Sequence, residues 1–370
     1  MTKKFIICIP SLRMGGAAKI ALNLSEQYLQ EGHDVYIIRT DGNSKDPDFS
    51  SLPAGLKVIR LPKIALHHFL RPFVNAFLLL KHFRKLQPDA IMAVRHDATV
   101  VSSLAWRLNG RKGRFVIRDI NPITKTLNRN GVMIAMIRAA YRAASAVIAN
   151  SKDVAEALKA KRWLDPARIH TIDNPVVSKS FYEKAAAPVN DNWLNKSDSP
   201  LIITIGRLDK MKDQATLIRA FDILRKQTEA RLMLIGDGPE ASNLQQLVNS
   251  LHLEQDVKLA GAMDNPYPLL KEAAIFALSS RYEGFGNVLV EALSLGKKVI
   301  STACTGGPAH ILNYGEYGRL VPVGDHQALA AAILEALAEP PNPDPLIRRA
   351  QDFSVERIAG AYANILFNKN

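Results

Sequence analysis

Short runs of apolar residues recur along the chain, and each is followed by a stretch with helical spacing. The runs are rich in Ile, Val, Leu and Phe, as in strands that are buried on both faces. The stretches between them, such as 16–31 and 212–227, place apolar residues at i, i+3 and i+4. This alternation predicts an α/β fold with doubly wound parallel sheets. The predicted strands are 4–9, 34–39, 56–60, 89–94, 114–118, 145–149, 200–206, 230–235, 256–260, 275–278 and 298–301.

The alternation is interrupted once, at residues 178–199, where the apolar period is lost and Pro, Asn, Asp and Ser accumulate. We interpret 179–199 as a linker between two Rossmann-like domains, 1–178 and 200–353. A last helical segment, 354–370, could pack back on the first domain. Ligands of doubly wound sheets bind at the carboxyl ends of the strands, so we expect a central cleft between the two domains to hold the ligand.

The composition indicates a folded chain in a reducing compartment. With 370 residues, of which 47% are apolar, the chain is long enough to form two cores. Its two cysteines, Cys8 and Cys304, are far apart and lack metal-ligand spacing. The first residues predict a strand rather than a secretory signal, and no run of about 18 apolar residues would span a bilayer. We therefore expect a cytoplasmic protein.

The net charge of +13 is concentrated in the first half of the chain. Residues 1–180 contain 29 Lys and Arg against 13 Asp and Glu, whereas residues 181–370 contain 19 against 22. Residues 60–125 alone contain 13 basic residues against three acidic ones. Because basic residues mix with aromatic ones in 60–87, this segment favours contact with an anionic membrane, the alternative being a core helix with a solvated rim. We expect no nucleic-acid partner, since no recognition-helix pattern is present.

The most informative motif is EGFGNVLVE, which extends from Glu283 to Glu291 between a predicted strand and a predicted helix. Gly284 and Gly286 allow a ligand to approach the backbone, and the helix is expected to begin at Asn287 as its N-cap. A helix start of this kind favours an anion. A retaining glycosidase needs its carboxyl groups about 5–5.5 Å apart, whereas two acids on one strand–loop–helix unit are better placed to bind two parts of one ligand. Ordinary residues of a turn and a helix remain the other interpretation.

A second motif, GRLDKMK at 206–212, supplies two candidate cations. Arg207 and Lys212 lie between a predicted strand and a predicted helix, at the mouth of the sheet. Arg offers a planar fork and Lys a point charge, and the pair suits a diphosphate. A solvated loop is the alternative for both residues, and we interpret Lys210 in this way.

The first domain contains weaker candidates. Gly15 and Gly16 follow the first predicted strand and would let a phosphate or sugar approach a helix start, although the dinucleotide fingerprint is incomplete. His96 lies just past a predicted strand. Its side chain could have a functional role, and the alternative is a structural hydrogen bond. The D-x-D spacing at 46–48 is interpreted as chance, so no metal site is expected. The candidate acceptor-binding residues are His96, Asp97, Arg118 and Asn121.

Together these motifs resemble glycosyltransferase family 4, the retaining, nucleotide-sugar-dependent transferases of GT-B fold, of the type found in bacterial cell-surface glycan synthesis. The resemblance covers nearly the whole chain, with the double glycine, GRLDKMK, GDGP, EGFGNVLVE and GRLVPVGD in family order. It implies that the first domain binds the acceptor and the second binds the donor. Ala18 and His310 depart from the family, which often has an acid at these positions.

The resemblance implies a role for each matching residue. Arg207 and Lys212 would bind the donor diphosphate and stabilise the departing nucleotide. Glu283 would hold sugar hydroxyls, Glu291 would bond the ribose, and His96 would lie close to the reacting sugar. Of these, Arg207, Lys212, Glu283 and His96 are the catalytic candidates. The other residues that would contact the donor are Gly15, Gly16, Gly284, Phe285, Gly286 and Asn287.

The expected function is transfer of a sugar from a nucleoside-diphosphate sugar, UDP-sugar rather than GDP-mannose, to a hydroxyl of a glycan or lipid-linked glycan. The resemblance implies retention of stereochemistry and no need for a metal or another cofactor. The basic region 60–125 would hold the protein on the inner face of the plasma membrane. The alternatives are a glycoside hydrolase or phosphorylase that uses Glu283 and Glu291 chemically, and a non-transferase Rossmann-fold enzyme such as an isomerase.

Overall fold

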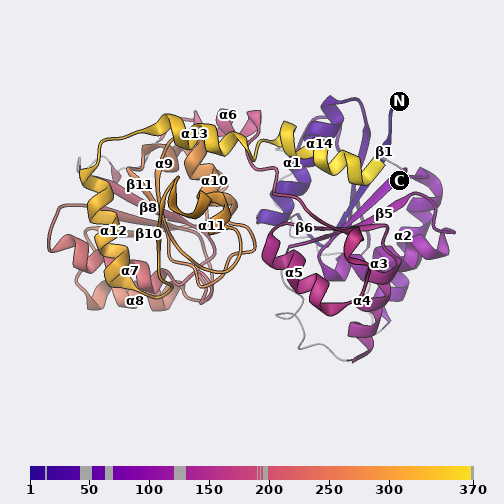
Figure 1. Cartoon of the computed structure of the whole chain (residues 1–370), viewed down its shortest axis with the longest axis horizontal. Helices are drawn as coiled ribbons and strands as arrows, with labels where there is room; N and C mark the ends of the chain where they lie inside the picture. Colours follow the sequence, from indigo (N-terminus) through magenta and orange to yellow (C-terminus); the bar gives the residue numbers. More distant parts are fainter. Residues whose placement is uncertain are drawn as a thin grey trace. The chain divides into compact units, whose positions relative to one another are not determined.

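The computed structural model describes residues 1–12, 15–41, 52–62, 70–120, 131–189, 191, 193–194 and 199–367. The chain divides into two compact units, one formed by Met1–Val176 with Val355–Asn370 and the other by Val177–Ser354. Each unit is a sheet with helices on both of its faces (Figure 1). Within the described ranges, no helix is long and apolar enough to cross a membrane.

The described part of the first unit forms a parallel seven-stranded sheet with the order β3-β2-β1-β4-β5-β6-β7. Helices α1 and α14 cover one face, and α2, α3 and α4 pack side by side on the other (Figure 1). The strands are β1 (Lys4–Ile9), β2 (Asp34–Arg39), β3 (Lys57–Arg60), β4 (Ala90–Val94), β5 (Arg114–Asp119), β6 (Ala146–Ala149) and β7 (Ile169–Thr171). The α-helices are α1 (Gly16–Gln30), α2 (Arg71–Leu86), α3 (His96–Leu108), α4 (Gly131–Ala143), α5 (Lys152–Lys161) and α14 (Val355–Phe367).

The second unit, over its described residues, forms a parallel six-stranded sheet with the order β10-β9-β8-β11-β12-β13. Its strands are β8 (Leu201–Ile205), β9 (Arg231–Ile235), β10 (Val257–Gly261), β11 (Ile275–Leu278), β12 (Lys298–Thr302) and β13 (Arg319–Val321). Its α-helices are α6 (Lys179–Ala185), α7 (Gln214–Arg225), α8 (Ala241–Ser250), α9 (Tyr267–Glu272), α10 (Asn287–Ser294), α11 (Pro308–Ile311), α12 (His326–Ala338) and α13 (Pro343–Gln351).

The predicted fold class is confirmed, because both sheets are parallel and are covered by helices on both faces. The apolar runs form strands because alternate residues face different helices. In β1, Ile6 and Cys8 join the core beneath α2 and α3, whereas Phe5 contacts Tyr28 of α1 and Phe367 of α14. All eleven predicted strands form. β7 and β13 were missed, since a strand of three residues is too short to show a period.

The segment predicted as a linker, 179–199, begins with a helix. Ser178 caps α6 by accepting a hydrogen bond from Phe181 N (3.2 Å), and the Phe181 ring packs on Tyr267 with centroids 4.8 Å apart. α6 therefore belongs to the second unit. Seven residues are too few for a helical period to stand out, although a serine three residues before a phenylalanine was a usable cap signal.

A buried arginine attaches the C-terminal helix α14 to the first sheet. The Arg118 side chain on β5 is 1% exposed. Its Nε donates to the hydroxyl of Tyr362 (2.9 Å), and its Nη2 donates to Asn174 Oδ1 (2.6 Å). On the same helix, the Ala359 carbonyl accepts from Tyr28 (2.9 Å). The last segment of the chain is thus fixed to the unit in which the chain begins.

We predict that Tyr362→Phe lowers the free energy of unfolding by about 1–3 kcal/mol, because it leaves a buried charged donor without its acceptor. Urea unfolding followed by circular dichroism measures this change. Tyr314→Phe is the matched control, since Tyr314 is 74% exposed and should change stability by less than about 0.5 kcal/mol. Equal stability of both variants would show that the Arg118–Tyr362 bond does not hold α14.

Candidate functional site

Two loops of the second unit lie side by side because the strands that precede them are neighbours. β8 and β11 are adjacent and parallel in the sheet, so the loops 206–213 and 279–286 leave the same edge of the sheet. These loops contain the predicted cations and the predicted carboxylate Glu283. Two hydrogen bonds join the loops, from Arg281 N to Met211 O (2.8 Å) and from Ser279 Oγ to Lys212 O (3.0 Å).

Lys212 and Glu283 form an ion pair between these loops. Lys212 Nζ lies 2.5 Å from Glu283 Oε1, and the Glu283 side chain is only 6% exposed. Ser280 Oγ donates to the same oxygen (2.6 Å), and the Ser280 carbonyl accepts from Thr302 Oγ1 (2.5 Å). Among the described residues, Oε2 of Glu283 has no hydrogen-bond partner. The carboxylate is therefore held through one oxygen and can accept from a ligand through the other.

Arg207 lies in the same loop as Lys212 but remains exposed to solvent. Its side chain is 69% exposed, and its Nε is 3.6 Å from Asp209 Oδ2. Its backbone, in contrast, is held in place, because Gln214 Nε2 donates to the Arg207 carbonyl (2.9 Å). An exposed ion pair at this distance is worth little, so the guanidinium can leave Asp209 for a stronger anion.

Helix α10 begins one residue earlier than predicted. The N-cap is Gly286 (φ 95°, ψ 49°) and not Asn287, which is the first helical residue. A left-handed conformation at the cap favours glycine, and the sequence rule that favours Asn at this position does not account for it. The positive end of the helix dipole begins next to the Glu283 loop, which suits an anion. Glu291 lies buried within α10, and the Phe285 ring packs on Phe353 with centroids 5.8 Å apart, so Phe285 can offer a ligand only its backbone.

Two glycines that the sequence analysis did not single out hold the Glu283 loop in place. A Cβ atom on Gly306 would lie 1.7 Å from the Glu283 carbonyl oxygen, and one on Gly307 would lie 1.8 Å from that of Phe285. Only glycine permits this close approach of two backbones. The signal was the sequence TGGP, which follows a predicted strand by three residues. Gly236 and Gly238 act similarly against the 206–213 loop, so the GDGP turn supports the cations.

Cys304 is buried close to the Glu283 loop. Burial, helped by the nearby negative charge of Glu283, raises the pKa of the Cys304 thiol to about 11. The thiol is therefore protonated at neutral pH. This environment excludes it as a nucleophile, since the thiolate is the reactive form.

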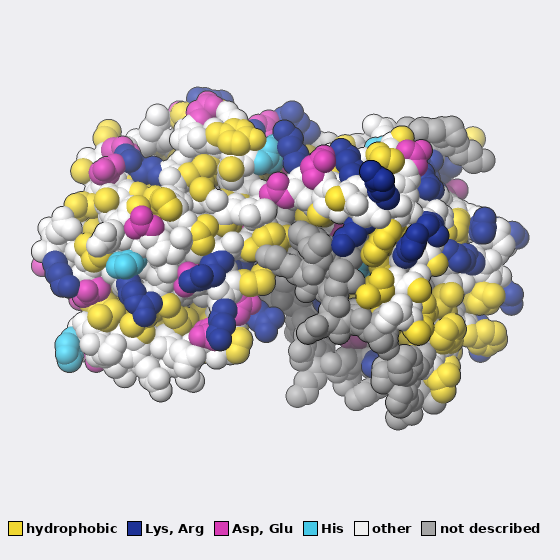
Figure 2. All heavy atoms as spheres, turned by 60° about the horizontal axis from the view of Figure 1, so that its bottom comes forward, with side chains coloured by type: hydrophobic (Ala, Val, Ile, Leu, Met, Phe, Trp, Pro, Cys, Tyr) yellow, Lys and Arg dark blue, Asp and Glu magenta, His cyan; other side chains and the backbone are white. Residues whose placement is uncertain are grey.

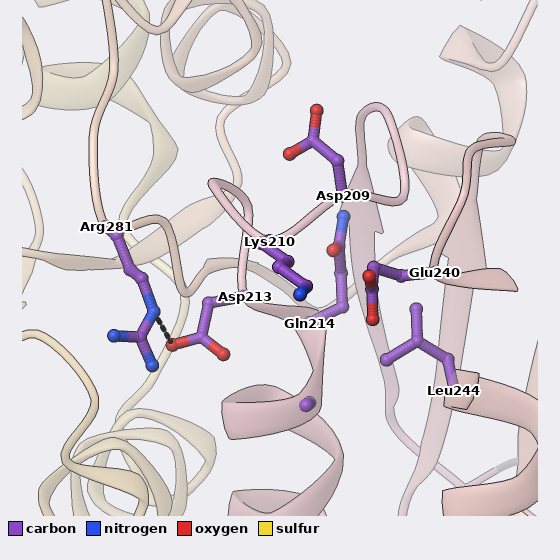
Figure 3. Close-up of a pocket in the computed structure, with 8 residues that line it drawn as sticks. Asp209, Lys210, Asp213, Gln214, Glu240, Leu244 and Arg281 are labelled. Atoms are coloured by element: carbon purple, nitrogen blue, oxygen red, sulfur yellow. Dashed lines mark ion pairs between the residues drawn. The ribbon is translucent and has the colours of Figure 1, made fainter.

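A pocket of about 300 Å³ lies next to the first turns of α7 and α8 and is lined by residues of the 206–213 loop (Figure 3). Asp213 Oδ2 pairs with Arg281 Nε at 2.9 Å on one wall, and Gln214, Glu240 and Lys210 line the space beside it. Lys212 and Glu283 do not line this pocket. Lys210 is exposed as predicted and contributes to the pocket rim.

The candidates of the first unit lie at the carboxyl end of its own sheet. Gly15 is the N-cap of α1 in an extended conformation, and Gly16 is its first residue. Asp97 is exposed in the first turn of α3. Arg118 is buried and bonded to Asn174 and Tyr362, which gives it a structural role, and its contact with an acceptor stays a prediction. Asn121 and residues 46–48 lie outside the described residues.

His96 is buried at the start of α3 and belongs to a short hydrogen-bonded chain. The Tyr141 hydroxyl donates to Asp119 Oδ2 (2.8 Å) and lies 3.4 Å from His96 Nδ1. Burial and the neighbouring Asp119 charge raise the pKa of Tyr141 well above its usual value, so its hydroxyl stays protonated. Since its one proton goes to Asp119, its oxygen accepts from His96. In the neutral imidazole, Nδ1 then carries the proton, which leaves Nε2 as an acceptor.

Comparison with known proteins gives the same class for both units. The model described as Glycosyltransferase Family 4 matches residues 14–179, and the model described as Glycosyl transferases group 1 matches residues 189–353. The lipopolysaccharide core biosynthesis glycosyltransferase LpsE of Rhizobium meliloti is 26% identical over 362 residues, which cover 96% of both chains.

Two further proteins are similar over much of the chain. The N-acetylgalactosamine-N,N'-diacetylbacillosaminyl-diphospho-undecaprenol 4-alpha-N-acetylgalactosaminyltransferase of Campylobacter jejuni is 28% identical over 278 residues, 74% of this chain and 71% of that protein. The crystal structure of HepE from Anabaena, in complex with UDP and glucose, has a TM-score of 0.74 at 21% identity and covers 99% of this chain and 96% of that one.

The two parallel-sheet units, the ion pair at the mouth of the second sheet and these matches define a GT-B glycosyltransferase. Residues 14–179 form a Glycosyltransferase Family 4 domain, and residues 189–353 form a group 1 glycosyltransferase domain. The predicted family and fold are thereby confirmed.

We predict that Gly306→Ala lowers sugar transfer by on the order of a hundredfold, because the added methyl group would displace the Glu283 backbone. Gly315→Ala is the matched control. Both glycines have a positive φ (118° and 112°), but a Cβ on Gly315 would meet nothing within 4 Å. If the two variants lose equal activity, backbone strain and not the position of Glu283 is responsible.

We predict that the neutral imidazole of His96 carries its proton on Nδ1 and that Tyr141→Phe shifts the proton toward Nε2, because the acceptor of Nδ1–H is lost. Nitrogen chemical shifts of ¹⁵N-histidine-labelled protein report the tautomer. Loss of the signal in His96→Gln identifies it among the nine histidines. The same tautomer in wild type and Tyr141→Phe would rule out the hydrogen-bonded chain.

Proposed function

We propose that the protein transfers a sugar, with retention of anomeric stereochemistry, from a nucleoside-diphosphate sugar to a hydroxyl of a glycan or lipid-linked glycan. The observation that carries the proposal is the Lys212–Glu283 ion pair, next to the exposed Arg207 and the start of α10. It combines a cation for phosphate with a carboxylate for sugar hydroxyls in one place. This is the pair of chemistries that a nucleotide sugar presents.

Binding of the donor exchanges the partners of this pair. The diphosphate takes Lys212 Nζ from Glu283 and attracts the Arg207 guanidinium away from Asp209. Glu283 is then free to accept from sugar hydroxyls, while Ser280 still orients it. Glu291, within α10, binds the ribose, and the backbone of Gly284, Phe285, Gly286 and Asn287 contacts the phosphate and sugar.

The positive charges stabilise the departing nucleoside diphosphate as the glycosidic bond breaks. Arg207 and Lys212, with the dipole of α10, supply this countercharge, so the reaction is proposed to need no metal and no other cofactor. The leaving phosphate takes the proton of the acceptor hydroxyl, which attacks from the same face of the sugar. His96, through Nε2, and the glycines at the start of α1 bind the reacting sugar from the first unit.

The relatives support a donor and an acceptor class. HepE was solved with UDP and glucose, which favours a UDP-sugar over GDP-mannose. The names of the Rhizobium meliloti and Campylobacter jejuni relatives refer to lipopolysaccharide core and to a diphospho-undecaprenol-linked acceptor. We therefore place the reaction in cell-surface polysaccharide, lipopolysaccharide or glycolipid synthesis. The basic region 60–125 is proposed to hold the first unit at an anionic membrane, where such acceptors reside.

The hydrolase alternative is weaker on structural grounds. A retaining hydrolase would use one carboxyl group as a nucleophile and the other as an acid. Glu283 is instead neutralised by Lys212 and bonded to Ser280, and Glu291 is buried within a helix. We therefore propose that both carboxylates bind the ligand and do not act as the acid and the nucleophile.

We predict that Arg207→Ala lowers kcat/KM for sugar transfer by an amount that corresponds to about 2–4 kcal/mol of lost transition-state stabilisation, the effect of removing one preorganised electrostatic donor. Lys212→Ala should lose a similar amount. Lys210→Ala, a cation in the same loop, should retain activity. The assay measures nucleotide release from UDP- and GDP-sugars in the presence of acceptor, and UDP-sugars are expected to support it.

Lys212→Ala could lose stability, because it leaves Glu283 buried without its partner. In that case Arg207→Ala is the decisive variant. The Arg207 side chain is exposed, so its removal leaves folding unchanged. Transfer by Arg207→Ala at the rate of Lys210→Ala, or sugar release with no nucleotide donor present, would refute the proposed function.

A further inference from the structure

The outer face of α2 carries large apolar side chains in solvent. Leu70, Phe73 and Phe77 are 57%, 54% and 57% exposed, and their spacing of three and four residues places them on one side of the helix. The opposite side, with Ala76, Leu79, Leu80 and Phe83, is buried in the core of the first unit. The exposed residues therefore contribute little to folding, and their exposure calls for another explanation.

The same row continues with basic residues. Lys81, Arg84 and Lys85 follow at the next helical positions and are exposed, and Lys81 Nζ lies 5.8 Å from the centre of the Phe77 ring. We name the row formed by Leu70, Phe73, Phe77, Lys81, Arg84 and Lys85 the α2 stripe. α2 contains no acidic residue. Figure 2 shows hydrophobic and basic side chains next to each other on the surface of this unit.

The neighbouring helix extends the pattern. α2 packs along α3, and Leu108, near the end of α3, is 59% exposed. Arg111 and Lys112 follow Leu108 and are exposed as well. Exposed apolar and basic residues thus occur on two neighbouring helices of this unit.

We infer that the α2 stripe docks the first unit on an anionic lipid bilayer, with Leu70, Phe73 and Phe77 inserted at the level of the headgroups. The basic end of the stripe pairs with lipid phosphates. An anionic bilayer matches both halves of the stripe, because its headgroups carry negative charge and its acyl chains lie directly beneath them. A nucleic acid would match the charge but leave the apolar half in solvent.

The orientation of α2 places the apolar half of the α2 stripe near the edge of the sheet that is proposed to bind the acceptor. Asn75 Nδ2 donates to the Thr40 carbonyl (3.0 Å), and Thr40 directly follows β2. The first turns of α2, which carry the apolar half of the stripe, therefore lie at the carboxyl edge of the sheet, where ligands of such sheets bind. Insertion of this end presents the acceptor edge to the bilayer. This step rests on the proposed function, because it assigns the first unit a lipid-linked acceptor.

The experiment is co-sedimentation of the full chain with vesicles of phosphatidylcholine, alone or mixed with phosphatidylglycerol. Binding is expected with the anionic vesicles and should weaken as salt rises. Lys81→Gln/Arg84→Gln/Lys85→Gln should reduce binding roughly a hundredfold, at about 1 kcal/mol for each basic side chain. Phe73→Ser/Phe77→Ser should reduce binding at least tenfold and leave its salt dependence unchanged.

Matched controls come from the second unit. Tyr314→Ser removes an exposed aromatic residue, and Lys179→Gln/Lys226→Gln/Lys271→Gln removes three exposed cations. Both should bind vesicles like the wild type. Thermal unfolding by circular dichroism verifies that each variant is folded.

Three results would overturn the inference. The first is an absence of wild-type binding to anionic vesicles, and the second is equal loss in the control variants. The third is a dimer in solution that Phe73→Ser/Phe77→Ser abolishes while vesicle binding persists, since the stripe would then contact a second copy of the chain. Sugar transfer to a water-soluble acceptor separates the claims, because it tests the proposed function and is independent of the stripe.

Discussion

The ion pair between Lys212 and Glu283 joins the two loops that form the candidate site of the second unit. A carboxylate as buried as Glu283 would be costly without a partner, and Lys212 supplies one at 2.5 Å. Both residues can meet only because β8 and β11 are neighbours in a parallel sheet. The glycines at 306 and 307 then let a third loop approach closely enough to fix the Glu283 backbone.

This pair explains why the site suits a nucleotide sugar. The cation and the carboxylate neutralise one another until a ligand offers each a better partner, a diphosphate for Lys212 and hydroxyls for Glu283. Ser280 keeps the carboxylate oriented during that exchange, and Arg207, exposed beside it, adds a second cation. In the first unit, hydrogen bonds from Asp119 through Tyr141 to His96 orient the histidine ring, much as Ser280 orients Glu283.

Much of this could be predicted from the sequence, for identifiable physical reasons. Strands buried on both faces produce apolar runs that are visible without a structure, and Glu283 and Lys212 stood in recognisable loops next to them. Gly306 and Gly307 were missed because their role lies in contacts with residues about 20 positions away in sequence. The structural role of Arg118 was missed because burial is not visible in a charged residue at the end of a strand. Tyr141 was missed because it looks like any aromatic residue on the core side of a helix.

A crystal structure of the protein with a bound UDP-sugar tests the central claim most directly. The account predicts that Lys212 Nζ moves from Glu283 to a diphosphate oxygen, at about 2.7–3.2 Å, and that Glu283 accepts a hydrogen bond from a sugar hydroxyl. A diphosphate bound elsewhere, with the Lys212–Glu283 pair still intact, would contradict it.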